Sequence, residues 1–134
     1  MTSATRRVAI IEESDVTRAL LEARMAAKSL GFGEVDIQMI ATAVSELARN
    51  IVKYADRGEI IIGQIENGLR VGIEVVARDK GPGIADIEQA VTDNYSSSGT
   101  LGLGLPGVKR MMDDFEIRST EGQGTTVKIT KWRH

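Results

Sequence analysis

The fold of this chain is decided by residues 59–78, EIIIGQIENGLRVGIEVVAR. Isoleucine and valine are frequent on both sides of Asn67-Gly68. An Asn-Gly pair between two such runs is the strongest short signal for a β-hairpin. We therefore expect strands at residues 59–66 and 69–78, paired antiparallel.

The segments around this hairpin alternate between helical and strand patterns. Apolar residues at helical spacing, or a proline in a first turn, predict helices at residues 14–30, 36–55, 85–91 and 105–112. Further strands are expected at residues 7–12, 115–120 and 125–132. Ser14 is the expected N-cap of the first helix, Gly31 its end, and Gly58 the C-terminal cap of the second. The pattern predicts a two-layer α/β (α+β) sandwich, with helices on one face of a mixed, largely antiparallel sheet.

Composition limits the classes of function. A chain of 134 residues with 42% hydrophobic content fits a single domain over residues 1–134. A formal net charge of −2, from 17 basic and 19 acidic residues, favours neither nucleic acid nor a membrane surface as a partner. The absence of cysteine and of a signal-like apolar N-terminus indicates a cytoplasmic protein. Because the single histidine is His134, the chemistry must come from carboxylates, amides and backbone groups.

The second predicted helix carries a first polar signature, Glu46-Leu47-Ala48-Arg49-Asn50. At 100° per residue, Glu46, Asn50 and Lys53 fall within about 60° of one another, roughly opposite the apolar stripe. An ordinary solvated helix face would show the same pattern. Alternatively, the carboxylate is a general base beside an amide that coordinates Mg²⁺, an ion that prefers oxygen ligands.

A second signature, Asp79-Lys80-Gly81-Pro82-Gly83, follows the apolar segment 71–77. Gly81 and Gly83 permit a tight turn, and an exposed turn would explain the pattern equally well. If it is functional, the Asp79 carboxylate could accept a hydrogen bond from an exocyclic amine such as that of adenine.

The third signature consists of Gly99, Gly102 and Gly104 ahead of Pro106. Residues 102–107 also fit G-x-G-x-x-G, but a dinucleotide site needs a strand directly before the glycines, and residues 94–100 are polar. No P-loop motif is present. The glycines could simply form a flexible loop, or they could lead into a helix whose free N–H groups bind phosphate.

The three signatures together resemble the N, G1 and G2 boxes of the gyrase, Hsp90, histidine kinase and MutL (GHKL) ATP-binding superfamily, which has the Bergerat fold. The short lid and residues 102–113, GLGLPGVKRMMD, are similar to the anti-sigma-factor type of serine/threonine kinase. Residues 45–51, SELARNI, and 31–36, GFGEVD, resemble the RsbT-type switch kinases of bacterial stressosomes.

The resemblance implies ATP and Mg²⁺ as cofactors and a role for each matched position. Glu46 would be the catalytic base, Asn50 the Mg²⁺ ligand and Asp79 the adenine acceptor. The remaining nucleotide-binding positions are Lys53, Gly81, Gly83, Gly99, Gly102, Gly104 and Thr125, although Thr125 could simply begin a strand. The implied partners are STAS-domain proteins, phosphorylated on serine or threonine, and a downstream signalling enzyme that the kinase activates in a stress-response pathway.

Residues 81–108 contain no lysine or arginine, whereas several related kinases have a basic residue in the lid. Charge on the γ-phosphate would then be balanced by Mg²⁺, backbone amides, a bound partner, or the side chains of Arg49, Lys53 or Lys109. Two alternatives stay open at this point. The chain could sequester a partner, as an anti-sigma factor does, without turning nucleotide over, or it could be the ATP domain of a histidine kinase. The second alternative is disfavoured, because the sequence shows neither a dimerisation helix pair nor an internal histidine.

Overall fold

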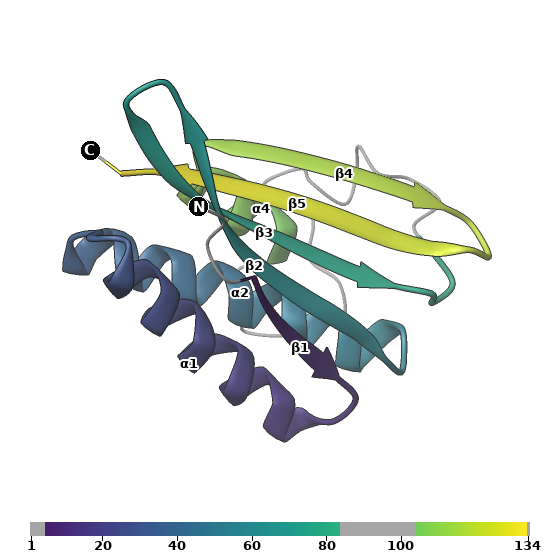
Figure 1. Cartoon of the computed structure of the whole chain (residues 1–134). Coiled ribbons are helices and arrows are strands. Elements are labelled where there is room, and N and C mark those ends of the chain that lie inside the picture. Colours follow the sequence, from purple (N-terminus) through teal and green to yellow (C-terminus); the bar gives the residue numbers. More distant parts are fainter. Residues whose placement is uncertain (1–4, 84–103, 134) are drawn as a thin grey trace.

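The structure is a computed structural model that describes residues 5–83 and 104–133. Two layers make up the fold, with helices packed on one face of a five-stranded sheet (Figure 1). The strands are β1 (Arg6–Ile10), β2 (Gly58–Asn67), β3 (Arg70–Asp79), β4 (Asp114–Thr120) and β5 (Gly124–Trp132). The described helices are α1 (Glu13–Ser29), α2 (Glu34–Tyr54) and α4 (Gly104–Met111). The expected two-layer sandwich is confirmed. The helix expected at residues 85–91 lies outside the described residues.

The sheet has the strand order β1-β2-β3-β5-β4, and all four pairings of the described strands are antiparallel. The central hairpin is present, but its turn lies one residue later than expected. Asn67 pairs with Arg70, so Gly68 and Leu69 form the loop. A turn over Asn67-Gly68 would need positive φ at both residues, whereas only Gly68 has it, at 63°. A turn with glycine in its first position satisfies the strand twist without straining Asn67.

Helix α1 begins differently from the sequence prediction. Its N-cap is Glu12, and Ser14 lies inside the first turn, where its hydroxyl contacts a Glu12 carboxylate oxygen at 3.2 Å. The Asp15 carboxylate accepts the backbone N–H groups of Ile11 at 2.9 Å and Glu12 at 3.1 Å. A carboxylate accepting two amides satisfies groups that the helix start leaves unpaired, so the helix begins earlier than Ser14 predicts.

Helix α1 ends as predicted. Gly31 follows its C-cap and donates its N–H to the Lys28 carbonyl at 3.0 Å, and Phe32 donates to Ala27 at 3.1 Å. These two bonds form a Schellman motif.

Gly58, in contrast, does not cap α2. It is the first residue of β2, and a Cβ there would collide with the Arg78 carbonyl. The pairing of β2 with β3 therefore requires a glycine at this position. The turn after α2 instead uses Asp56, at φ 68°.

The core lies between the helices and the sheet. Its largest fully buried side chains come from both layers and are Ile10, Ile40, Leu47, Ile60, Ile62, Ile73 and Ile129. Helix α4 packs against α2, and its Leu105 and Val108 are also buried. This packing holds the first residue of α4 near the middle of α2.

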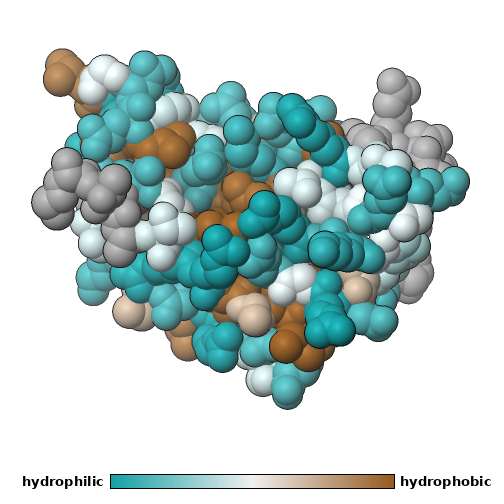
Figure 2. All heavy atoms as spheres, turned by 45° about the vertical axis from the view of Figure 1, so that its right-hand side comes forward, coloured by the Kyte–Doolittle hydropathy of each residue, from teal (hydrophilic) through white to brown (hydrophobic). Residues whose placement is uncertain are grey.

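The surface in Figure 2 is mostly hydrophilic, with hydrophobic residues visible in separate patches. Large exposed apolar side chains include Val35 on α2 and Leu69 at the tip of the β2–β3 hairpin. Within residues 5–83 and 104–133, no helix combines the length and apolar character that crossing a bilayer requires.

Candidate active site

Glu46 is buried in the structure. Only 7% of the residue is exposed, although it lies on the helix face that the sequence places opposite the apolar stripe. One carboxylate oxygen accepts a bond from the Arg49 guanidinium at 2.9 Å. The other accepts the backbone N–H of Gly104 at 3.3 Å. The interpretation of a solvated face is therefore wrong for Glu46, because α4 covers it.

Asn50 and Lys53 follow Glu46 along α2 toward its C-terminal end. Asn50 is half-buried, one helical turn after the carboxylate. Lys53 is exposed, and its ammonium lies 5.2 Å from the centre of the Tyr54 ring. Exposure thus increases from Glu46 to Lys53, so this face of α2 leads from the protein interior to solvent.

Asp79 ends β3 and begins the loop of the second signature. One of its carboxylate oxygens accepts the N–H of Gly81 at 2.8 Å. A Cβ on Gly81 would lie 2.6 Å from the Cβ of Ala55, the C-cap of α2. A Cβ on Gly83 would collide with the Thr120 carbonyl. The glycines therefore let this loop pass between the end of α2 and the turn after β4, which an ordinary exposed turn would not require.

Thr125 lies directly beside Asp79, because the two residues are paired across β3 and β5. Its hydroxyl oxygen is 2.8 Å from that of Ser119 on β4. Gly124 precedes it, and a Cβ at this position would collide with the Asp79 backbone carbonyl. Thr125 is thus both the second residue of β5 and a neighbour of the predicted adenine acceptor.

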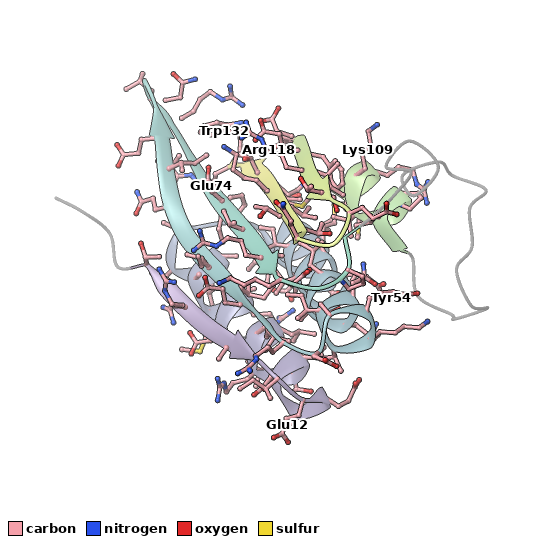
Figure 3. The ribbon with its side chains drawn as sticks, turned by 90° about the vertical axis from the view of Figure 1, so that its right-hand side faces the viewer. Glu12, Tyr54, Glu74, Lys109, Arg118 and Trp132 are labelled. Carbon is pink, nitrogen blue, oxygen red and sulfur yellow. The ribbon has the colours of Figure 1, made fainter. Side chains whose placement is uncertain are left out.

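The start of α4 completes the candidate site. Gly104 is its first residue, close to the expected start at Leu105, and its N–H points to Glu46. Gly99, Gly102 and the polar residues 94–100 lie outside the described residues. Lys109 is exposed, and in Figure 3 it points away from α4 on the same side of the molecule as Tyr54, at the end of α2.

The metal-ligand oxygens and backbone N–H groups at this site fit a magnesium nucleotide. Mg²⁺ usually takes one or two protein oxygens together with substrate phosphates and water. The side-chain amide of Asn50, one helical turn from the carboxylate of Glu46, supplies one oxygen of this kind. The N-terminal end of α4 supplies backbone N–H groups and the positive end of a helix dipole, which favour phosphate.

Comparison with known proteins assigns this arrangement to a family. The sequence model of the histidine kinase-like ATPase domain matches residues 11–131. This chain belongs to the histidine kinase-like ATPase family. The assignment agrees with the resemblance of its three boxes to the GHKL superfamily.

Two relatives of this ATPase domain cover most of its length. The serine/threonine-protein kinase RsbT of Bacillus subtilis is 49% identical over 125 residues, or 93% of this chain and 94% of that protein. An anti-sigma F factor of Thermoanaerobacter sp. is 35% identical over 103 residues, or 72% of this chain and 71% of that protein. A crystal structure containing the RsbU and RsbW domains of a Mycobacterium tuberculosis protein matches with a TM-score of 0.67. It is 16% identical, over 98% of this chain and 34% of that one, and so supports the fold alone.

Sequence reasoning missed two features of this ATPase domain site. The Ser119 hydroxyl, which contacts Thr125, lies on a strand with no motif of its own. The contact between Arg49 and Glu46 could have been predicted, because residues three apart on a helix are neighbours.

Proposed function

We propose that this chain is an ATP-dependent serine/threonine protein kinase. The observation that carries the proposal is the position of Glu46. Its carboxylate is almost fully buried, and one of its oxygens lies 3.3 Å from the backbone nitrogen of Gly104, the first residue of α4. Burial of a charged carboxylate costs several kcal/mol of desolvation free energy, so a carboxylate with no functional role would be more stable in contact with water. The position of Glu46 next to an anion-binding helix end suits a base that acts where phosphate is transferred.

In the proposed reaction, Glu46 accepts the proton of a substrate serine or threonine hydroxyl. The hydroxyl oxygen attacks the γ-phosphorus of ATP, the bond to the β–γ bridging oxygen breaks, and ADP leaves. A carboxylate has about four lone-pair positions, so the bonds from Arg49 and Gly104 leave room for the incoming proton. When bound, Mg²⁺ neutralises charge on the phosphates, and Asn50 is the residue that would hold it.

The adenine is proposed to bind at the other end of the site. Asp79 uses one carboxylate oxygen for Gly81 and has a second oxygen for the exocyclic amine. Thr125 and the glycines of the Asp79 loop would line this pocket, and Lys53 would lie toward its phosphate side.

By likeness to RsbT, we propose that the substrates are STAS-domain proteins of a bacterial stressosome. Phosphorylation of one partner would release the kinase to activate a downstream signalling enzyme. An alternative is supported by the anti-sigma F factor relatives, namely a module that sequesters a partner in a nucleotide-dependent way without transferring phosphate.

Glu46→Gln distinguishes the two functions. Incubation with radiolabelled Mg-ATP and purified STAS-domain proteins should give phosphoserine or phosphothreonine with the natural chain. Glu46→Gln should bind ADP with unchanged affinity but transfer phosphate about 10²- to 10⁴-fold more slowly, because an amide cannot take the proton.

Glu34→Gln, at the exposed start of the same helix, is the matched control and should transfer normally. Transfer by Glu46→Gln at the natural rate would exclude the proposed base. Absence of transfer by the natural chain to every STAS protein that it binds would favour the sequestering module.

A further inference from the structure

Lys131 is a buried lysine that none of the three signatures includes. Only 7% of the residue is exposed. It occupies an inward position of β5, two residues after Ile129 and four after Val127, where an apolar residue is expected. Removing an ammonium from water costs several kcal/mol, so its burial requires a specific set of partners.

The partners of Lys131 lie at the ends of two helices. Its ammonium donates to the backbone carbonyl of Met111, the last residue of α4, at 2.7 Å. It also lies 4.0 Å from the carboxylate of Asp36 in the first turn of α2. A cation at the C-terminal end of a helix satisfies a free carbonyl and interacts favourably with the helix dipole.

The opposite end of α4 lies in the candidate site. Helix α4 has eight residues, and its first N–H contacts Glu46. A helix of two turns is marginal on its own, so its position depends on packing and on the contacts at its ends. At about 1.5 Å per residue it is about 12 Å long, so a shift at Met111 is carried to Gly104 as a rigid body.

We propose that Lys131 is a positioning residue for phosphoryl transfer, holding α4 so that its phosphate-binding end stays aligned with Glu46. This inference rests on the proposed kinase function. Lys131 is about 12 Å from the reacting atoms along α4 and acts through the helix. A misplacement of 1 Å in a catalytic arrangement can lower a rate about a hundredfold.

The segment between α4 and β4 has anchors of its own. Asp113 donates its N–H to Thr130 at 2.9 Å and accepts the N–H of Trp132 at 2.7 Å. These bonds attach the connecting segment to β5, whereas Lys131 contacts a carbonyl of the helix itself. Loss of Lys131 should therefore loosen α4 without detaching the chain that follows it.

Lys131→Met tests the proposal, since methionine has a similar volume and no charge. We expect kcat for transfer to fall about tenfold or more, while KM for ATP changes less than about threefold. The adenine end of the site is six residues away along β5, at Thr125, about 20 Å from Lys131. Hydrogen exchange of the α4 amides should become faster than in the natural chain.

Lys128→Met is the matched control. Lys128 is on the same strand but on the open face of the sheet, with 44% of its side chain exposed and surface ion pairs to Glu116 and Glu74. It should leave kcat and α4 exchange unchanged. Lys131→Arg keeps the charge and the donors and should restore part of the lost rate.

A purely structural lysine predicts a different result. Replacement of a buried charge by an apolar side chain of similar size is often neutral or stabilising, so kcat and KM would then be unchanged. Natural transfer together with natural α4 exchange in Lys131→Met would overturn the proposal. If Lys131→Met does not fold, Lys131→Gln retains a donor without the charge, and natural transfer by that variant with unchanged α4 exchange would overturn it equally.

The test separates this inference from the proposed function. If the natural chain binds Mg-ATP but phosphorylates no partner, the kinase proposal fails. The exchange comparison between Lys131→Met and Lys128→Met still decides whether Lys131 holds α4.

Discussion

At the scale of single residues, the site has to accommodate the charge of Glu46 next to bound phosphates. Glu46 is an anion beside the helix end where phosphates would bind, and two like charges at short range repel strongly in a poorly solvated place. Arg49 offsets part of this repulsion, because its guanidinium lies 2.9 Å from the carboxylate while its own side chain is about half exposed. The pair would thus weaken the repulsion between the proposed base and a bound triphosphate.

Asp79 is the residue expected to determine base recognition. Asp79→Asn retains one oxygen for the Gly81 amide but presents an NH₂ group where a second acceptor is needed. We expect ADP binding, measured by calorimetry, to weaken by roughly ten- to a hundredfold, as for loss of a hydrogen bond to a charged group. Asp56→Asn is the control, because asparagine tolerates the positive φ of that exposed position. Natural ADP affinity in Asp79→Asn would place the adenine elsewhere.

At the scale of elements, the start of α1 depends on a carboxylate. The N–H of Ile11, followed by that of Glu12 and the charge of Arg18, lowers the pKa of Asp15 below its ordinary value of 3.8. The charged form is thus favoured in the folded state. Its stabilising effect is complete above the unfolded pKa and disappears as the pH falls through the lower folded pKa.

We therefore expect the natural chain to be more stable than Asp15→Asn near neutral pH. The difference in free energy of unfolding should stay constant down to about pH 5 and shrink below pH 3.8. Urea titrations between about pH 7 and pH 2.5 would measure it. Glu13→Gln removes a charge from the same turn without touching the amides of Ile11 and Glu12, and should not reproduce this dependence. A pH-independent difference would contradict the assignment.

The junction of β3 and β5 leaves no room for a side chain at Gly124. This residue has φ 118°, and a Cβ would collide with the Asp79 carbonyl. Gly124→Ala should lower the free energy of unfolding by about 3 kcal/mol or more and weaken ADP binding by displacing Asp79. Gly122→Ala has a similar positive φ, 82°, but nothing within 4 Å of its Cβ, so it should cost only about 1–2 kcal/mol. Equal losses in the two variants would show that backbone strain alone matters.

For the whole molecule, we expect the charge balance of the proposed phosphoryl transfer to depend on the bound partner. Residues 81–108 have no basic side chain. The described cations near the site include Arg49, which is paired with Glu46, and the exposed Lys53, Lys80 and Lys109. An added arginine can raise the rate of phosphoryl transfer by about 10³- to 10⁵-fold. We expect hydrolysis of ATP by the chain alone to be slower than transfer to a bound partner by at least about a hundredfold. Single-turnover rates with and without the partner would measure this ratio, and equal rates would contradict it.

The local features of this protein were readable from its sequence. Alternating β-branched residues, helical spacing and the Schellman glycine at Gly31 depend on the residues nearby, so their elements were predicted to within a few residues. Two of the misplaced features were also local. The Asp15 carboxylate moves the start of α1 ahead of Ser14, and the hairpin loop is shifted by one residue to Gly68 and Leu69. Gly58 was misplaced for a non-local reason, because it lies against the Arg78 carbonyl of β3.

Only the tertiary structure decided what is buried at the site. A helical wheel places Glu46 on the polar side of α2, because it cannot include Gly104, which lies 58 positions later in the chain. Lys131 likewise interrupts the apolar pattern of β5, and its burial is explained only by its contacts with Met111 and Asp36 in the folded chain. Burial and charge pairing are properties of distant segments that pack together, so spacing along the chain does not contain them.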